Sequence, residues 1–211
     1  MRGATDYAHL LNLLTAYEGP GVFNQYRQTD PALDRPEAAT IRRANLVSYL
    51  EAFAGARYIL VGEAAGYAGC RFSGIPFTCE AQLAGPDCLT WAERLNLGRS
   101  STAETPWVER SARIVWKALG ERRDCLLWNA FPWHPFGARG PLSNRTPGRE
   151  VRAGREALEC LLALFPQAQP YAVGRTAERA LAALGIQTGA IRHPSHGGAA
   201  QFAAGVAALG E

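Results

Sequence analysis

The chain has 211 residues, a length that suits one domain with a sizeable core. Hydrophobic residues make up 47% of it and charged residues 19%, which excludes an intrinsically disordered protein. The net charge of +3 permits an acidic partner without requiring one. The sequence shows neither a leader pattern nor an apolar run of membrane-spanning length, so we expect a cytoplasmic protein with no membrane partner.

The N-terminal part of the chain is predicted to be helical. Apolar residues at helical spacing predict helices over residues 6–17 and 36–54, each followed by glycine. The polar stretch 23–34 between them is predicted to be a loop. We therefore expect a single domain over residues 1–211, with residues 1–55 as a helical extension packed on it.

Four short, β-favouring segments are predicted strands, at residues 57–61, 125–128, 171–173 and 189–191. Helices are predicted over residues 80–95, 106–119, 149–165, 175–184 and 198–209. Glycine-punctuated segments at residues 62–77 and 137–148 are predicted loops. Strands that alternate with helices indicate an α/β fold, here a three-layer α/β/α sandwich around a central four-stranded, mostly parallel sheet.

Polar or tightly turning residues follow three of the predicted strands. They are Gly62-Glu63-Ala64-Ala65-Gly66, Asn129-Ala130-Phe131-Pro132 and His193-Pro194-Ser195. The carboxyl ends of parallel strands line one crevice of an open sheet, so these patches are expected to converge on one ligand. A carboxylate, an amide and an imidazole in one crevice can read a planar polar ring and help to cut a bond to it.

Each patch also fits a purely structural role. Glu63 is the only ionisable group in its turn, and a surface turn has the same pattern. Phe77 offers a face for stacking a nucleobase, worth roughly 1–3 kcal/mol, or is a core residue under a loop. Asn129 can match the carbonyl and the N3–H of uracil, or cap a helix. His193 can stabilise charge on a leaving group, or lie in a helix-capping loop.

The cysteines and arginines carry less information. Cys70, Cys79 and Cys88 are evenly spaced, but the sequence has no C-x-x-C pair, so we expect reduced thiols and no metal site. Residues 139–155 hold five arginines against one acid, Glu150. This arrangement is typical of a phosphate track and equally of a solvated charged face.

Taken together, the motifs resemble the uracil-DNA glycosylase superfamily over roughly residues 58–198. Residues 62–66 are similar to the first motif of its bacterial and archaeal iron–sulfur branch, usually Gly-Glu-Ala-Pro-Gly. Residues 74–77 are similar to the base-stacking segment of that branch, and residues 144–147 to a stretch between its motifs. Residues 193–195 resemble the second motif, whose histidine contacts the uracil O2 as it becomes anionic.

The resemblance implies roles for the matching residues. It implies Glu63 and His193 as catalytic residues, Gly62, Ala64, Tyr67, Phe77 and Asn129 as base-binding residues, and Ser195, His196 and Arg145 as DNA-binding residues. Phe77 would be the platform for the ring, and Asn129 would read its edge. A water held near Glu63 and Ala64 would attack the sugar.

The sequence departs from the family pattern at several positions. Ala65 replaces the usual proline, and Ala64 falls where the best-known branch carries a catalytic aspartate, which the iron–sulfur branch also lacks. Gly66 takes the place of a thymine-excluding tyrosine, and His196 is the nearest candidate for the wedge that fills the gap left by a flipped base. Cys160 falls near one cluster-ligand position, but its paired partners are absent, so we expect no cluster and no other cofactor.

The resemblance implies a monofunctional glycosylase of base excision repair. It would flip deoxyuridine out of DNA and hydrolyse its N-glycosidic bond, leaving an abasic site and free uracil. We expect a monomer that acts on uracil-containing DNA in the bacterial nucleoid. The alternative is a non-catalytic binder of damaged or single-stranded DNA on the same fold. A small-molecule hydrolase of flavodoxin-like architecture is less favoured, because the chain lacks a nucleophile elbow.

Overall fold

A sheet of four strands, in the order β3-β2-β5-β6, lies at the centre of the computed structural model, which describes residues 7–85 and 87–210. The strands are β2 (Tyr58–Ala64), β3 (Cys125–Phe131), β5 (Gln169–Val173) and β6 (Ala190–Ile191). Every neighbouring pair in this sheet is parallel. The predicted four-stranded sheet is therefore confirmed.

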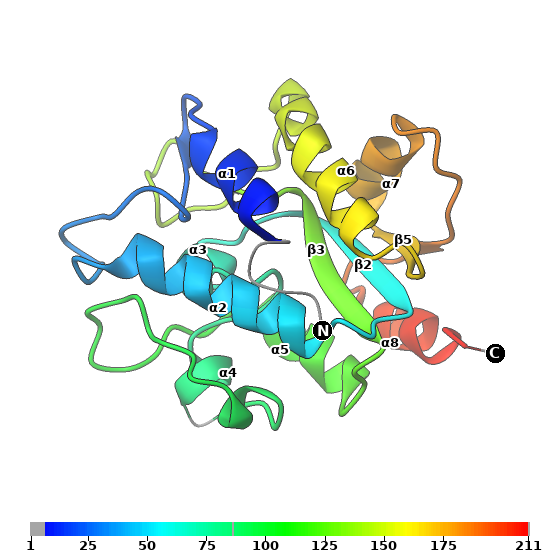
Figure 1. Cartoon of the computed structure of the whole chain (residues 1–211), viewed down its shortest axis with the longest axis horizontal. Coiled ribbons are helices and arrows are strands. Elements are labelled where there is room, and N and C mark those ends of the chain that lie inside the picture. The colour runs from blue at the N-terminus through cyan, green and yellow to red at the C-terminus, as the bar shows by residue number, and fades with distance from the viewer. Residues whose placement is uncertain (1–6, 86, 211) are drawn as a thin grey trace.

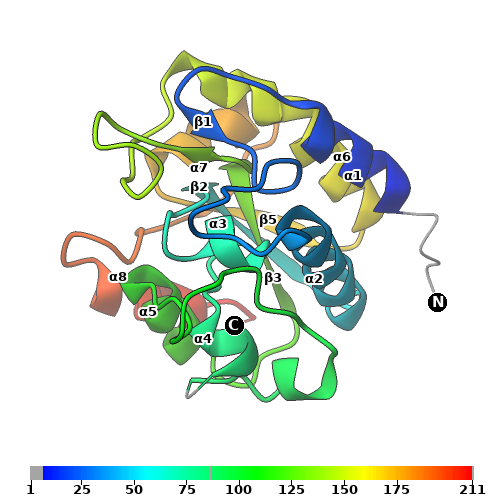
Figure 2. The same ribbon diagram turned by 90° about the vertical axis from the view of Figure 1, so that its left-hand side faces the viewer.

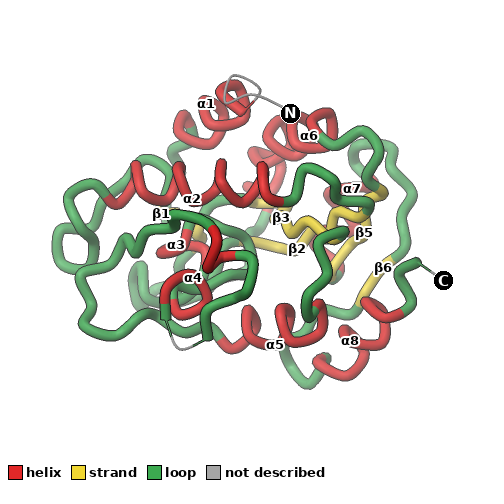
Figure 3. The backbone as a smooth tube through the Cα atoms, turned by 60° about the horizontal axis from the view of Figure 1, so that its bottom comes forward, coloured by secondary structure: helices red, strands yellow, loops and turns green. Residues whose placement is uncertain are grey.

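Helices cover both faces of the sheet (Figures 1 and 3). On one face, α6 (Arg155–Leu164) and α7 (Arg175–Ala182) pack on the strands. On the other face lie α5 (Arg110–Leu119) and α8 (Ala199–Ala207), which pack on each other. The three-layer arrangement is confirmed. No helix among the described residues is both long and apolar enough to cross a bilayer.

The two central strands extend further than the sequence predicts. The pairing of β2 with β3 continues through Gly62 opposite Asn129 and Ala64 opposite Phe131. The prediction ended both strands where the apolar runs end, but backbone pairing does not require apolar side chains. The residues that carry the first motif and the amide are consequently neighbours on adjacent strands, held by sheet hydrogen bonds.

The N-terminal residues pack against the rest of the protein through specific contacts. Helix α1 (Ala8–Ala16) packs on α6 (Figure 2), and the Leu14 carbonyl accepts a hydrogen bond of 2.8 Å from Trp133 Nε1. The first residue of the predicted 23–34 loop, Phe23, belongs instead to a short strand, β1 (Val22–Phe23), which pairs antiparallel with β4 (His134–Pro135). Helix α2 (Ala38–Ala52) lies within its predicted range of 36–54. Asp6, the first residue of the predicted 6–17 helix, lies outside the described residues.

Several predicted helices are interrupted. The predicted 80–95 helix is two short turns, α4 (Ala81–Ala84) and η2 (Ala92–Arg94), because Gly85 adopts an extended conformation. The predicted 106–119 helix begins only at Arg110, and Glu109 before it is extended.

The predicted 149–165 helix also changes character along its length. Its first part is the 3₁₀ helix η3 (Arg149–Gly154), and α6 follows. At the junction, a Cβ on Gly154 would come within 2.0 Å of the Ala130 carbonyl oxygen, so only glycine fits against β3 there. The predicted loop over residues 62–77 contains a short helix, α3 (Cys70–Ser73).

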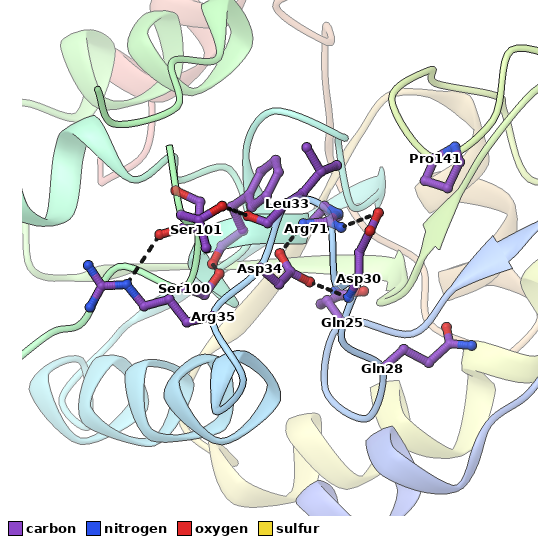
Figure 4. A network of polar contacts seen from close by, with 12 residues as sticks. Gln25, Gln28, Asp30, Leu33, Asp34, Arg35, Arg71, Ser100, Ser101 and Pro141 are labelled. Atoms are coloured by element: carbon purple, nitrogen blue, oxygen red, sulfur yellow. Dashed lines mark hydrogen bonds and ion pairs between the residues drawn. The ribbon is translucent and has the colours of Figure 1, made fainter. Parts of the chain in front are cut away.

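A buried ion cluster joins the N-terminal residues to α3 (Figure 4). The carboxylate of Asp34 lies 2.5 Å from Arg42 Nη2 and 2.6 Å from Arg71 Nη1, and all three side chains are 0% exposed. Arg71 Nη2 also lies 3.5 Å from Asp30, and its guanidinium covers the rings of Phe23 and Phe72. Charges buried in this way require counter-charges, so the cluster fixes how α2, α3 and the loop that precedes α2 pack together.

A second buried carboxylate, Glu80, anchors the segment that leads to α5. It accepts hydrogen bonds of 2.9 Å from the backbone N–H groups of Ser100 and Ser101 and one of 2.5 Å from the Ser101 hydroxyl. The backbone N–H of Trp107 donates a further bond of 3.4 Å. Together with a single antiparallel bridge between Asp34 and Ser101, these bonds hold the irregular segment in place.

We predict that Asp34→Asn destabilises the protein by ~3–5 kcal/mol, because the buried guanidinium of Arg42 would lose its paired carboxylate and that of Arg71 would keep only Asp30, 3.5 Å away. Urea unfolding measures the effect. The control is Asp87→Asn, which removes a solvent-exposed pair with Arg113 and should cost ~1 kcal/mol or less. Equal losses in the two variants would show that the buried cluster does not stabilise the fold.

Candidate functional site

A cleft of about 320 Å³ opens where β2 ends and where the chain leaves β6. Residues of the first and third sequence motifs and of neighbouring loops form its wall, among them Glu63, Phe77, Glu109, Arg145, His193 and His196. The patches at the ends of β2 and β6 therefore meet at one cleft, as predicted for the carboxyl ends of parallel strands. The patch at residues 129–132 does not line this cleft; Asn129 lies on β3 beside Gly62 and next to the Phe77 ring.

Phe77 lies directly over the first motif. A Cβ on Gly62 would come within 2.1 Å of Phe77 Cζ and 3.0 Å of Asn129 Oδ1, so the ring and the amide share the space above this glycine. Phe77 has a φ of 52°, a left-handed conformation that costs a non-glycine residue about 1–3 kcal/mol. The hydroxyl of Ser73 holds the next residue by donating a 2.6 Å hydrogen bond to the Thr78 carbonyl. The loop is thus fixed in a conformation that presents the ring to the cleft.

Asn129 carries a hydrogen-bond donor that the protein leaves unused. Its side chain is 1% exposed, and Nδ2 has no partner among the described residues. A buried amide without a partner costs about 1–3 kcal/mol, so such a group in a native fold calls for a ligand or a water. The position of Asn129 on β3 beside Gly62 of β2 keeps the amide next to the Phe77 ring.

His193 is fixed in one tautomer by the residue two positions later. The backbone N–H of Ser195 donates to its Nδ1 at 3.2 Å, and the Ser195 hydroxyl lies 2.7 Å from the same atom. Since Nδ1 accepts, the neutral ring carries its proton on Nε2. Burial lowers the pKa of His193, and Glu63 opposes this effect only in part. The ring is therefore a neutral donor at pH 7, and its centroid lies 6.0 Å from that of Phe77.

Glu63 lines the cleft and is not free. Its Oε2 accepts a 2.6 Å hydrogen bond from the hydroxyl of Thr176 at the start of α7. The neighbouring turn is braced by His134, whose Nδ1 lies 2.9 Å from the Ala65 carbonyl oxygen and whose Nε2 lies 2.8 Å from the Pro141 carbonyl oxygen. Ala64 also lines the cleft, so the turn presents both backbone and a carboxylate to it.

Two predicted site residues, Tyr67 and Arg145, make contacts within the protein that the motifs do not indicate. Tyr67 is not among the residues that line the cleft; its ring contacts Trp107, and its backbone N–H donates to Asn144 Oδ1 at 2.9 Å. Arg145 lines the cleft, but its guanidinium pairs with Glu150 and donates to the Phe136 and Gly21 carbonyls. Arg145 therefore ties the 137–148 loop to the N-terminal residues.

The two predicted DNA-binding residues of the second motif both reach the cleft. Ser195 and His196 line both the cleft and a neighbouring groove of about 620 Å³. His196 has a φ of 51° and is followed by Gly197 with a φ of 78°. These two left-handed residues form a tight turn that carries the exposed imidazole outward.

Glu109 is a cleft residue that the sequence reasoning missed. The sequence places Glu109 inside the predicted helix 106–119. In the structure it is the extended residue just before α5 begins. The protein around it raises the pKa of this carboxyl to about 7 through desolvation. A Cβ on Gly66 would come within 1.8 Å of Glu109 Oε1, and one on Gly69 within 2.2 Å of Oε2. The carboxyl thus occupies space that side chains in this turn would otherwise fill.

The structure describes all five cysteines as free thiols. Burial raises the pKa of Cys70 and of Cys125 to about 12 in each case. In the described part of the chain, no three His, Cys, Asp or Glu side chains are grouped closely enough to hold a metal ion.

We predict that the imidazole of His193 is neutral at pH 7, with its proton on Nε2 and a pKa below the ordinary 6.5. Long-range ¹H–¹⁵N correlation spectra of the labelled protein across pH distinguish the tautomers, and His193→Gln assigns the signals. Ser195→Ala should keep the same tautomer, because the backbone N–H still donates to Nδ1. A proton on Nδ1, or a charged ring at pH 7, would contradict this geometry.

Comparison with known proteins agrees with the fold and the motifs. A family model described as the uracil DNA glycosylase superfamily matches residues 51–204. The crystal structure of wild-type Pedobacter heparinus SMUG2 has a similar fold, with 15% identity and a TM-score of 0.58 over 97% of this chain and 96% of that one. A search of curated proteins finds no match. Because the family model covers most of the chain, the protein belongs to the uracil DNA glycosylase superfamily.

Proposed function

We propose that this protein hydrolyses the N-glycosidic bond of deoxyuridine in DNA. The observation that carries the proposal is the buried, unpartnered amide of Asn129 beside the ring of Phe77. A flat polar ring stacked on Phe77 would supply the partner that the amide lacks. Family membership supports the reaction class, a DNA glycosylase.

Uracil fits the two edges of the Asn129 amide. Nδ2 donates to the O4 carbonyl, and Oδ1 accepts from N3–H. Cytosine presents an amino group and an unprotonated ring nitrogen on the same edge, so it would leave donor facing donor and acceptor facing acceptor. In a buried site that mismatch discriminates strongly, because the protein groups lose their water without gaining partners.

Bond cleavage needs a stabilised leaving group and a water. The flipped nucleotide costs about a few kcal/mol to extrude, after which the base departs as an anion with charge on O2. His193 Nε2–H donates to that oxygen, and such a donor is worth about 10²–10³ in rate. A water near Glu63 and Ala64 attacks the anomeric carbon of the cationic sugar and loses its proton to Glu63 or to solvent. Glu63, held by Thr176, orients that water and stabilises the sugar cation.

The DNA strand lies along the mouth of the cleft in this proposal. Ser195 binds a phosphate through its hydroxyl or backbone, and His196 fills the space left by the flipped base. Arg175 and Arg192, which line the neighbouring groove, neutralise the adjacent phosphates. The protein acts as a monomer in the cytoplasm and releases free uracil.

We predict that the protein releases uracil from a single-stranded oligonucleotide and that Asn129→Ala lowers kcat/KM by about 100-fold, since a buried pair of hydrogen bonds is lost. Alkali treatment breaks the strand at each abasic site and so reports excision. The matched control, Asn96→Ala, changes an exposed asparagine and should have no effect.

The same assay tests the alternative of a non-catalytic DNA binder. Gel retardation of the oligonucleotide without strand breaks would favour that alternative over the glycosylase. Full activity of Asn129→Ala would show that this amide does not read the base. If the oligonucleotide is neither retarded nor broken, both DNA-directed functions are contradicted.

A further inference from the structure

Glu109 stands out because it faces the cleft without a partner. Its side chain has no hydrogen bond or ion pair within the described residues, whereas Glu63, the other carboxylate of the cleft, is bound by Thr176. The segment before Glu109 is anchored by the buried Glu80, and α5 starts immediately after it. The position of the carboxyl is thus set by rigid neighbours on both sides.

The elements around Glu109 bring no opposite charge close to it. The turn at Gly66 and Gly69 contributes backbone atoms. The thiols of Cys70 and Cys79 lie close enough for the charge of Glu109 to be one of the causes that raise their pKa values. The other ionisable groups of the cleft wall are Glu63, Arg145, His193 and His196. Arg145 is paired with Glu150, and desolvation is the sole cause that raises the pKa of Glu109 to about 7.

We propose that Glu109 is a specificity-determining residue that, when protonated, donates a hydrogen bond to a carbonyl oxygen of the base held in the cleft. The inference rests on the proposed glycosylase function and assigns the site a third donor. It adds to Asn129 Nδ2, which lacks a partner, and to His193 Nε2–H. A carbonyl oxygen accepts two hydrogen bonds, so O2 and O4 of uracil can satisfy all three donors.

The donor count selects a class of base. Three donors and the single acceptor Asn129 Oδ1 suit a ring with carbonyls on its edges, and they disfavour a ring with an exocyclic amine. Ionised Glu109 would reverse its own contribution: it loses the donor and places a negative charge beside the departing base anion. Because like charges repel, the carboxylate form opposes both binding and bond cleavage.

The pH dependence follows from the sign of this shift. Desolvation favours the neutral carboxyl, which is therefore present below about pH 7 and lost as the pH rises through that value. Because burial lowers the pKa of His193 below its ordinary value, its ring is already neutral at pH 7 and contributes no change above that pH. We expect kcat/KM on a uracil strand to fall by up to about tenfold per pH unit above pH 7.

The test compares pH profiles between about pH 6 and about pH 8.5. Glu109→Gln keeps a donor at every pH, so its activity should be lower than that of the wild type by about threefold at the acid end and should not decline toward the alkaline end. Glu109→Ala should lose about tenfold at the acid end and also lack the decline. Glu104→Gln, which changes an exposed carboxyl, should keep the wild-type profile.

A second measurement does not depend on bond cleavage. Calorimetry in buffers of different ionisation enthalpy measures proton uptake when the protein binds a strand with 2′-fluoro-deoxyuridine, whose glycosidic bond resists hydrolysis. At about pH 7.5 the wild type should take up most of one proton and Glu109→Gln none. This result would support the role of Glu109 even if the natural strand were not cleaved, which would refute only the catalytic part of the proposed function.

Three outcomes would overturn the inference. If wild-type activity rises through pH 7 and Glu109→Gln is inactive at every pH, Glu109 is a general base. If profiles and proton uptake are the same in wild type and Glu109→Gln, the carboxyl does not touch the base. If the wild type does not bind the analogue strand, the inference fails together with the proposed function.

Discussion

The geometry of the cleft depends on the buried ion pairs that the carboxylate of Asp34 forms. It pairs with Arg42 of α2 and Arg71 of α3, and all three side chains are shielded from water. Few arrangements of these segments keep both guanidinium groups paired, so the electrostatic cost of the others selects the native one. Glu80 does the same for the irregular residues before Glu109. Buried charges thereby fix loop segments that lie outside the four-stranded sheet.

Inside the cleft, burial acts on acid and base in opposite directions with one result. It lowers the pKa of His193 and raises that of Glu109, so both groups tend toward their neutral forms near pH 7. At these two positions the cleft therefore presents hydrogen-bond donors, whereas Glu63 contributes a carboxylate. Such a surface suits a ligand that enters uncharged and leaves as an anion, since donors strengthen as the charge grows.

The sequence was sufficient for the sheet and for the meeting of the patches at the ends of β2 and β6, because short apolar runs and the crevice rule of parallel sheets are local or topological signals. It was insufficient for strand ends: Gly62 and Asn129 look like turn residues, and only pairing across the sheet makes them strand residues. Glu109 could not be assigned to the cleft, because its contact with Gly66 arises from tertiary packing across residues far apart in the chain. The roles of the individual cleft residues stay predictions.

The ion cluster shows that the start of the family-model match differs from the start of the residues that the fold requires. The family model starts at residue 51, downstream of both Asp34 and Arg42. A fragment trimmed to that start would keep Arg71 but lose both acids that pair with it, Asp30 and Asp34, together with Phe23, which its guanidinium covers. The stretch that the family model matches is thus smaller than the set of residues that neutralise one another in the interior, and an expression vector that begins at residue 51 would omit part of that set.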